Sequence, residues 1–154
     1  MEISKAIWES MLDADMNERY WAHLSRNYYK EDRCIKIFLA LMTSGVVASW
    51  NLWSNVQIIW KALSAIAAIT AIISPILKLE KSIDALSTIK GKWKRVLGEY
   101  EILWLSKINK SEAELIKEYT IIKEKESEID EENYPVKKKL ILLIQDEVLR
   151  SRGI

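Results

Sequence analysis

Charged and apolar residues alternate along most of this chain, but not in one central segment. Between residues 37 and 77 the only charged residue is Lys61. Two apolar segments, 34–53 and 56–77, make up this region, and each carries one lysine near an end, where its long stem can reach the headgroup layer. Their lengths are those of helices that cross the hydrocarbon core of a bilayer. The pattern therefore predicts two membrane-spanning helices.

The short link between the segments predicts a transmembrane hairpin. Asn51–Asn55 is uncharged, and Trp50, Trp53 and Trp60 resemble the aromatic belt found at one membrane interface. The outer ends of the two segments are basic, with Arg26, Lys30, Arg33, Lys36, Lys78 and Lys81. By the positive-inside rule, both termini are expected on the cytoplasmic side of the membrane.

A soluble alternative places the same two segments inside a helical bundle. Such a bundle would have to enclose both of them completely, because neither shows a polar face broad enough for a soluble surface. The remainder of a 154-residue chain leaves little material for that enclosure. The membrane hairpin is the interpretation that the lengths favour.

The flanking regions, 1–33 and 78–154, have the spacing of amphipathic helices. Two short helices or one bent helix fit the N-terminal region, with polar residues at Asp13–Asn17 as candidate caps. Its apolar positions are Ile3, Ile7, Trp8, Met11 and Leu12, followed by Met16, Tyr20, Trp21, Leu24 and Tyr28. The predicted fold class is all-α: an N-terminal amphipathic helix, a two-span hairpin over 34–77, and a cytosolic helical stalk or bundle.

Three helices are expected after the second span. The first carries a coiled-coil-like stripe: Leu79, Ile83, Leu86, Lys90, Trp93, Leu97, Tyr100 and Trp104. Ser111 with Glu114 is a capping-box pattern that opens the next, and a break follows over 130–135. The last helix has the apolar positions Val136, Leu140, Leu143, Ile144 and Val148.

Small and hydroxyl residues recur in both apolar segments, largely at four-residue spacing. They are Ala40, Thr43, Ser44, Ala48 and Ser49 in the first, and Ser64, Ala67, Ala68, Thr70, Ala71 and Ser74 in the second. Such stripes allow helix backbones to approach closely in lipid. One interpretation is packing within the hairpin; the other is that one stripe closes the hairpin while a second joins protomers or lines a pore.

Two basic clusters lie in the C-terminal region. They are Lys90, Lys92, Lys94 and Arg95, which surround Trp93, and Lys137, Lys138 and Lys139. Clustered cations can contact anionic headgroups or a phosphorylated ligand. The alternative is that both clusters belong to solvated helix faces, which the acidic residues around them favour.

The residues for most catalytic chemistry are missing from the sequence. His23 is the only histidine and Cys34 the only cysteine, which excludes histidine-based triads, HExxH zinc sites and thiolate metal cages. No phosphate-binding loop is present, and 23 basic against 22 acidic residues give a formal net charge of only +1, which does not indicate nucleic-acid binding. An enzyme, a cofactor and direct nucleic-acid contact are therefore not expected.

The order of these parts resembles the SLATT family, two-transmembrane effectors associated with SMODS nucleotidyltransferases and SLOG sensor domains in bacterial conflict systems. The resemblance covers essentially the whole chain and lies in Glu18-Arg19-Tyr20-Trp21, in Arg26 and Arg33, in the hairpin, and in Trp93 and Tyr100 of the charged stalk. It implies a homo-oligomeric, pore-forming effector that acts on the lipid bilayer in antiphage abortive infection, with a neighbouring sensor or nucleotide-signal synthase as its partner. A membrane-anchored adaptor that docks a cytosolic protein without forming a pore is the alternative.

Overall fold

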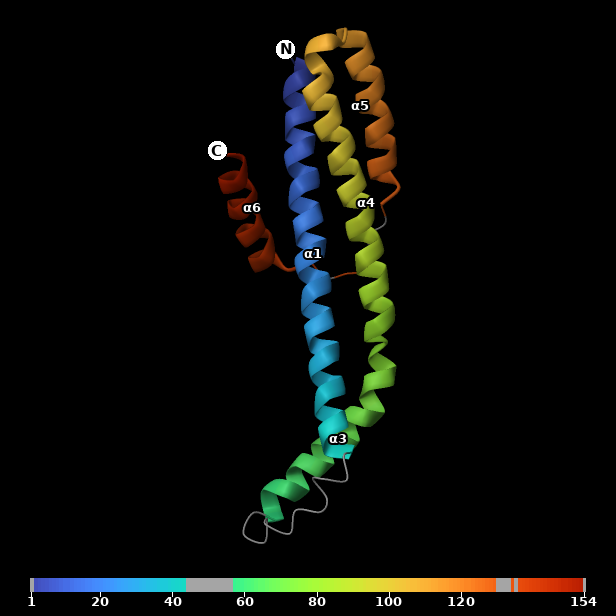
Figure 1. Cartoon of the computed structure of the whole chain (residues 1–154), viewed down its shortest axis with the longest axis vertical. Helices are drawn as coiled ribbons and strands as arrows, with labels where there is room; N and C mark the ends of the chain where they lie inside the picture. The colour runs from blue at the N-terminus through green and yellow to red at the C-terminus, as the bar shows by residue number, and fades with distance from the viewer. Residues whose placement is uncertain (1, 44–56, 130–133, 135, 154) are drawn as a thin grey trace. The chain divides into compact units, whose positions relative to one another are not determined.

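The protein is helical throughout the residues that its computed structural model describes, which are 2–43, 57–129, 134 and 136–153 (Figure 1). The elements in chain order are α1 (Glu2–Thr43), α3 (Gln57–Leu77), α4 (Leu79–Ser106), the short 3-10 helix η2 (Lys107–Asn109), α5 (Glu112–Ser127) and α6 (Lys138–Arg152). The all-α prediction is confirmed for these residues. The turn predicted at Asn51–Asn55 lies outside them.

The chain divides into two compact units. Met1–Leu24 and Ala85–Ile154 form the first, called here the helical unit, and Ser25–Asp84 form the second, called here the apolar unit. The apolar unit is thus longer at both ends than the predicted hairpin at 34–77. Both α1 and α4 have residues in each unit, so neither boundary coincides with the end of a helix.

In α4, buried side chains form a regular stripe at steps of three and four residues. These residues are Leu86, Ile89, Trp93, Val96, Tyr100 and Leu103. The predicted stripe was right at alternate positions, but it was wrong at Lys90, where the structure buries Ile89 instead. A buried lysine without a paired anion is costly, and the one-residue change keeps its ammonium accessible to water. Leu97 and Trp104 are accordingly only half-buried.

Helix α1 is unbroken through Asp13–Asn17, where the sequence suggested a cap or bend. Neither Gly nor Pro interrupts the helix there. One of the polar residues that suggested a break faces the interior instead, since Asp15 is buried between arginines. Ser10, which precedes this run, is also buried, with its hydroxyl 3.0 Å from the Tyr119 hydroxyl. The buried apolar residues of α1 are Ile7, Met11, Ala14, Tyr20, Trp21 and Leu24.

Tyr100 joins α4 to α5 at the centre of the helical unit. Its side chain is fully buried, and its hydroxyl donates a 2.7 Å hydrogen bond to Glu126 Oε2. Burial, and secondarily this bond, raise the pKa of Tyr100 above its ordinary value. The phenol therefore stays a neutral donor at any physiological pH.

The capping box predicted from Ser111 and Glu114 is confirmed at the start of α5. The Ser111 hydroxyl accepts from the Glu114 N–H at 3.4 Å, and Glu114 Oε2 accepts from the Ser111 N–H at 2.8 Å. Hydrogen bonds from the Ser111 side chain and backbone hold the pKa of Glu114 below its ordinary value. This contribution to stability is complete above the ordinary pKa and is lost as pH falls through the lowered one.

We expect Ser111→Ala to destabilise α5 by about 1 kcal/mol, since it removes the side-chain acceptor for an orphan N–H group. The pKa of Glu114 should rise toward its ordinary value because its strongest hydrogen bond is lost. Urea unfolding and an NMR titration of the Glu114 carboxyl measure the two effects. An unchanged pKa would show that the box does not form in solution.

Candidate functional site

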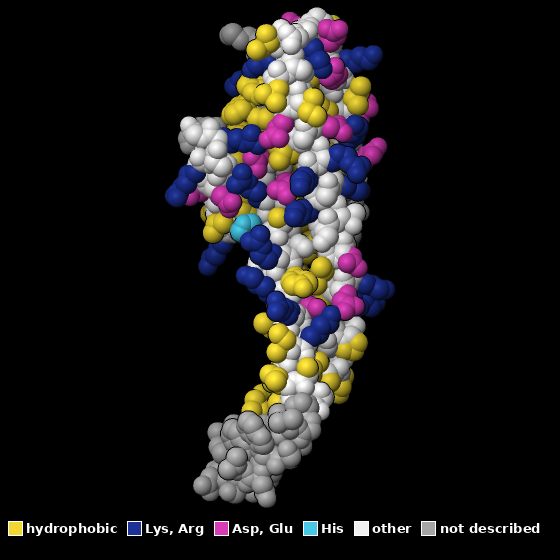
Figure 2. Space-filling model, viewed as in Figure 1, with side chains coloured by type: hydrophobic (Ala, Val, Ile, Leu, Met, Phe, Trp, Pro, Cys, Tyr) yellow, Lys and Arg dark blue, Asp and Glu magenta, His cyan; other side chains and the backbone are white. Residues whose placement is uncertain are grey.

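The apolar unit exposes its large side chains. Eight of them are between 43% and 69% accessible: Ile37, Leu41, Ile66, Ile69, Ile72, Ile73, Ile76 and Leu77. Among the described residues of 25–84, no apolar side chain belongs to the buried core. In Figure 2 the lower part of the molecule carries hydrophobic side chains with no Lys, Arg, Asp or Glu between them. The enclosure that a soluble bundle needs is therefore not present in the described part of these segments.

By length and composition, no single helix of the described residues qualifies to cross a membrane. Ala62–Leu77 and Leu79–Asn109 qualify as a pair, bent by 41° at the break between them.

Only one face of α3 is partly covered. Leu63, Ala67, Thr70 and Ser74 are half-buried and recur at steps of four and three residues. In the C-terminal part of α1, a matching half-buried stripe consists of Ile35, Phe38, Leu39 and Met42. Within the apolar unit these are the faces on which a helix pair can close, and the α3 face consists mainly of small or hydroxyl residues.

A second small-residue face of α3 is left open. Ser64, Ala68 and Ala71 are exposed and form a stripe directly beside the half-buried one that contains Ala67 and Ser74. On α1, Ala40 and Thr43 are also exposed, whereas Ser44, Ala48 and Ser49 lie outside the described residues. The predicted set thus divides into a covered and an uncovered stripe.

Two hydroxyl groups of the apolar unit, those of Thr43 and Thr70, are satisfied within their own helices. Thr43 Oγ1 donates to the Leu39 carbonyl at 2.8 Å, and Thr70 Oγ1 donates to the Ile66 carbonyl at 2.8 Å. Such back-bonding hides a polar hydrogen from an apolar environment. These helices can therefore enter lipid without exposing an unpaired hydroxyl donor at either threonine.

Charges gather where the apolar unit's hydrophobic faces begin. Lys36 Nζ lies 2.9 Å from Asp32 Oδ2 on α1 and 2.5 Å from Glu80 Oε1 on α4. The contact with Glu80 joins α1 to the first turn of α4 within this unit. Cys34 is exposed nearby in sequence, and none of the described residues forms a metal-ligating group.

The first basic cluster is part of a mixed-charge groove between α4 and α5. Lys92, Arg95 and Lys125 line it together with Glu99 and Glu128, around a volume of about 310 Å³. Lys125 Nζ is 2.7 Å from Glu99 Oε1, and Lys92 Nζ donates to the Glu128 carbonyl oxygen at 3.4 Å. The groove brings together two of the predicted cations and an additional lysine from α5. Lys90 and Lys94 do not line it.

The second basic cluster lies at the start of α6. The backbone N–H of Lys137 donates to the Tyr20 hydroxyl at 3.1 Å, which fixes the entry of the chain into α6. Lys138 and Lys139 are exposed, and neither forms an ion pair within the described part of the chain.

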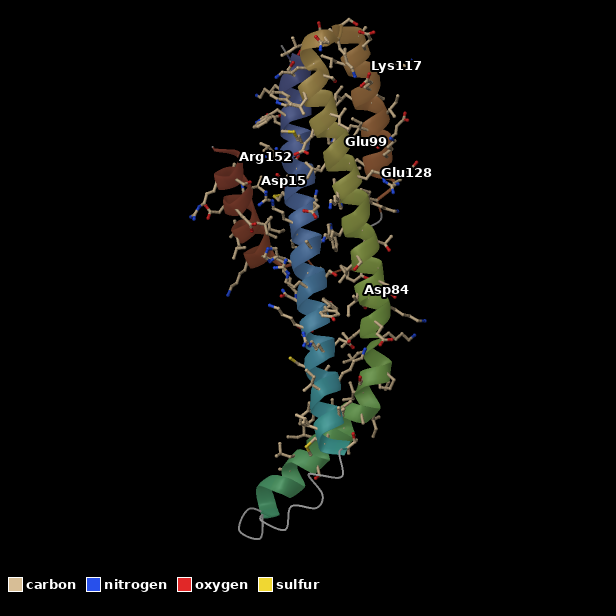
Figure 3. All side chains as sticks on the ribbon, viewed as in Figure 1. Asp15, Asp84, Glu99, Lys117, Glu128 and Arg152 are labelled. Carbon is tan, nitrogen blue, oxygen red and sulfur yellow. The ribbon has the colours of Figure 1, made fainter. Side chains whose placement is uncertain are left out.

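A charge network that the sequence did not reveal joins α6 to α1 and α4. Asp15 is buried and accepts from Arg19 Nε at 2.6 Å and from Arg152 Nε at 2.9 Å (Figure 3). Arg152 also donates to Glu101 at 2.8 Å, and Arg19 donates to Glu147 at 3.0 Å. The four-residue spacing of Asp15 and Arg19 is typical of an ion pair along one helix. No local pattern could indicate an arginine more than a hundred residues away.

An aromatic cavity of about 140 Å³ adjoins this network. The rings of Tyr20 and Trp21 meet edge to face at 5.2 Å, and Trp21 meets Tyr134 in the same way at 5.8 Å. Tyr20 and Trp21 are the aromatic residues of the sequence motif named above. In the structure they hold the segment before α6 against α1.

No protein-family model, no curated protein and no solved structure matches this chain.

Proposed function

We propose that this protein is an oligomeric two-span effector that permeabilises the bacterial inner membrane in antiphage abortive infection. In this proposal the apolar unit inserts as a hairpin with both termini cytoplasmic, and the helical unit controls assembly. The support comes from the apolar unit, from the division of its small residues into two stripes, and from the resemblance to the SLATT family.

The observation that carries the proposal is the exposure of the isoleucines on α3. Each large aliphatic side chain left in water forgoes about 1.5–3 kcal/mol of burial free energy. Ile66, Ile69, Ile72 and Ile76 are all more than half exposed. A monomer in water does not usually keep so continuous an apolar surface, whereas hydrocarbon chains would cover it at no cost.

The uncovered stripe of Ser64, Ala68 and Ala71 supports assembly through the spans. With the covered stripe engaged in the hairpin, this face is available for close contact with another helix. A ring of such contacts would bring small residues and the Ser64 hydroxyl close to its axis. This is the feature that favours a pore over a simple anchor.

Expression in bacteria with a membrane-potential dye tests this function. We expect depolarisation once the trigger is present, and we expect Ala68→Leu with Ala71→Leu to abolish it, because larger side chains prevent close helix approach. Ile69→Leu, which changes shape on a neighbouring exposed face, is the matched control and should remain active. Inserted protein that never depolarises the membrane would contradict the proposal.

The adaptor remains the second candidate, and one observation favours it. Between α4 and α5 the helical unit has an apolar groove, lined in part by the exposed side chains of Ile102 and Ile121, that could receive a partner. An adaptor that still inserts should tolerate the two leucine substitutions. Retained function in that double variant would favour the adaptor over the pore.

A further inference from the structure

Two apolar surfaces of the helical unit are uncovered, and they lie on different helices. One is the groove between α4 and α5, of about 210 Å³, with Ile102 and Ile121 at its edges. Its lining consists of Glu99, Ile102, Leu103, Glu118, Ile121 and Ile122. The other is the outer face of α6, where Leu142 and Leu149 are exposed.

We propose that these two surfaces bind one another between copies, so that the outer face of α6 in one protein occupies the α4–α5 groove of the next. This association goes beyond the proposed function and does not depend on it, since a pore or an adaptor could be assembled in this way. It requires that α6 remain attached to its own protein while it presents its outer face.

The structure of α6 meets that requirement. Ile144 and Val148 are buried on its inner face, and Arg152 holds its last turn to Asp15 and Glu101. On the opposite side, Lys138 and Leu142 are one turn apart, and Leu149 follows two turns later. One face of α6 therefore packs against its own protein, while the other is exposed.

The positions of the two surfaces prevent a protein from filling its own groove. In Figure 1, α6 lies beside α1, whereas α5 lies on the other side of the α1–α4 pair. The contacts agree with this, because α6 is joined to α1 through Arg19 and Glu147, and α5 is joined to α4 through Lys125 and Glu99. A pairing of unlike surfaces repeats from copy to copy, and it closes as a ring or continues as a chain.

Length and charge both match a helix-in-groove contact. With 16 residues in α5 and 15 in α6, the two helices are each about 22–24 Å long. α5 carries five glutamates and three lysines, whereas α6 carries four cations and two carboxylates. Of these cations, Arg150 and Arg152 are already paired with carboxylates of their own chain. A second copy can therefore offer Lys138 and Lys139 to the groove, whose lining carries the carboxylates of Glu99 and Glu118.

Local ion pairs do not prevent this exchange. Glu118 and Glu99 at the groove are paired with Lys110 and Lys125 of the same chain, at surface sites where such pairs contribute little. Lys138 on α6 has no partner within its own described chain. It can share a groove carboxylate without the loss of any contact.

A contact of one helix in one groove is smaller than the interface that a stable complex in dilute solution needs. We therefore expect association when copies share a membrane or micelle, where their effective concentration is high. This condition determines how the test is done: with the full chain, in reconstituted vesicles.

Cross-linking between two differently tagged variants tests the proposal. In a Cys34→Ser background, Ile102→Cys marks the groove of one copy and Leu142→Cys marks α6 of the other. A short bis-maleimide should join them in the mixture, while either variant alone should give no dimer. Thr120→Cys, on the exposed far side of α5 from Ile121, is the matched control for the groove and should cross-link only at background level.

Each outcome decides the question. A dimer formed by the groove variant alone or by the α6 variant alone would overturn the proposal in favour of a symmetric contact. A mixture that does not cross-link, although both variants retain wild-type helicity, would overturn it and leave the groove to another protein. A second pair combines Ile102→Cys in the groove of one copy with Leu149→Cys on α6 of the other. Adding Leu142→Glu to the Leu149→Cys copy should lower the cross-linking yield roughly tenfold or more, because a carboxylate would be buried without a partner.

These readouts are separate from depolarisation. Cross-linking of the expected pair in a protein that never depolarises a membrane would support the head-to-tail contact and contradict the pore. Depolarisation by a protein that gives no such cross-link would support the pore and contradict the head-to-tail contact.

Discussion

Replacing Asp15 by Asn is expected to release α6 from the helical unit. The substitution removes the only charge that both Arg19 and Arg152 contact, at a carboxylate that is 96% shielded from solvent. Breaking a buried pair from one side typically costs about 3–5 kcal/mol. Here the two guanidiniums are about a quarter exposed and keep Glu147 and Glu101, so we expect about 2–3 kcal/mol.

Hydrogen exchange of the α6 backbone measures this directly. Protection of the α6 amides should fall by roughly 30- to 100-fold, since each 1.4 kcal/mol is a factor of ten. Amides of α5, which do not depend on this network, should change little. Asp146→Asn is the matched control: its pair with Arg150 is largely exposed and should contribute about 0–0.5 kcal/mol. Equal effects of the two substitutions would show that Asp15 does not hold α6.

Ile69→Asp separates a membrane environment from an aqueous one. Ile69 is 57% exposed and near the middle of the second apolar segment. In water such a surface substitution changes stability by no more than about 0.5 kcal/mol. At the centre of a membrane span it costs about 3–4 kcal/mol, because an aspartate must leave water and an isoleucine is lost from hydrocarbon.

The measurement is the fraction of protein that stays with membranes after carbonate extraction. We expect a clear loss for Ile69→Asp and none for Ile116→Asp, the same change at a similarly exposed position of α5 in the helical unit. If both variants fractionate like the original protein, the isoleucines of α3 do not contact lipid, and the membrane effector would have to be abandoned.

Local patterns were sufficient for much of the fold. The helical class, the capping box of Ser111 and the burial of Ile144 and Val148 all depend on residues within one or two turns of each other. Periodicity also located the core of α4, but only to within one residue at alternate positions. Leu97 and its buried neighbour Val96 are both aliphatic, so composition could not decide which of the two faces inward.

Contacts between distant residues were not predictable in this way. The sequence suggested a break at Asp13–Asn17 because aspartate is a good helix cap, yet Asp15 is buried because Arg152 lies against it. The groove between α4 and α5 likewise depends on how the two helices pack together, and the periodicity of one helix does not show this. The spacing of the small residues predicted both stripes of α3, but the exposure of their side chains was needed to tell the covered stripe from the uncovered one.

The backbone of Lys78 has a consequence for how the chain leaves its apolar region. Pro75 lies within α3, and the helix continues past it to Leu77, after which Lys78 adopts a φ of 47°. A left-handed lysine costs about 1–2 kcal/mol, a strain that persists only while its surroundings hold it. Relaxation of this one residue to right-handed torsions would join α3 and α4 into one continuous helix. The chain therefore holds backbone strain at the position where its sequence becomes charged again.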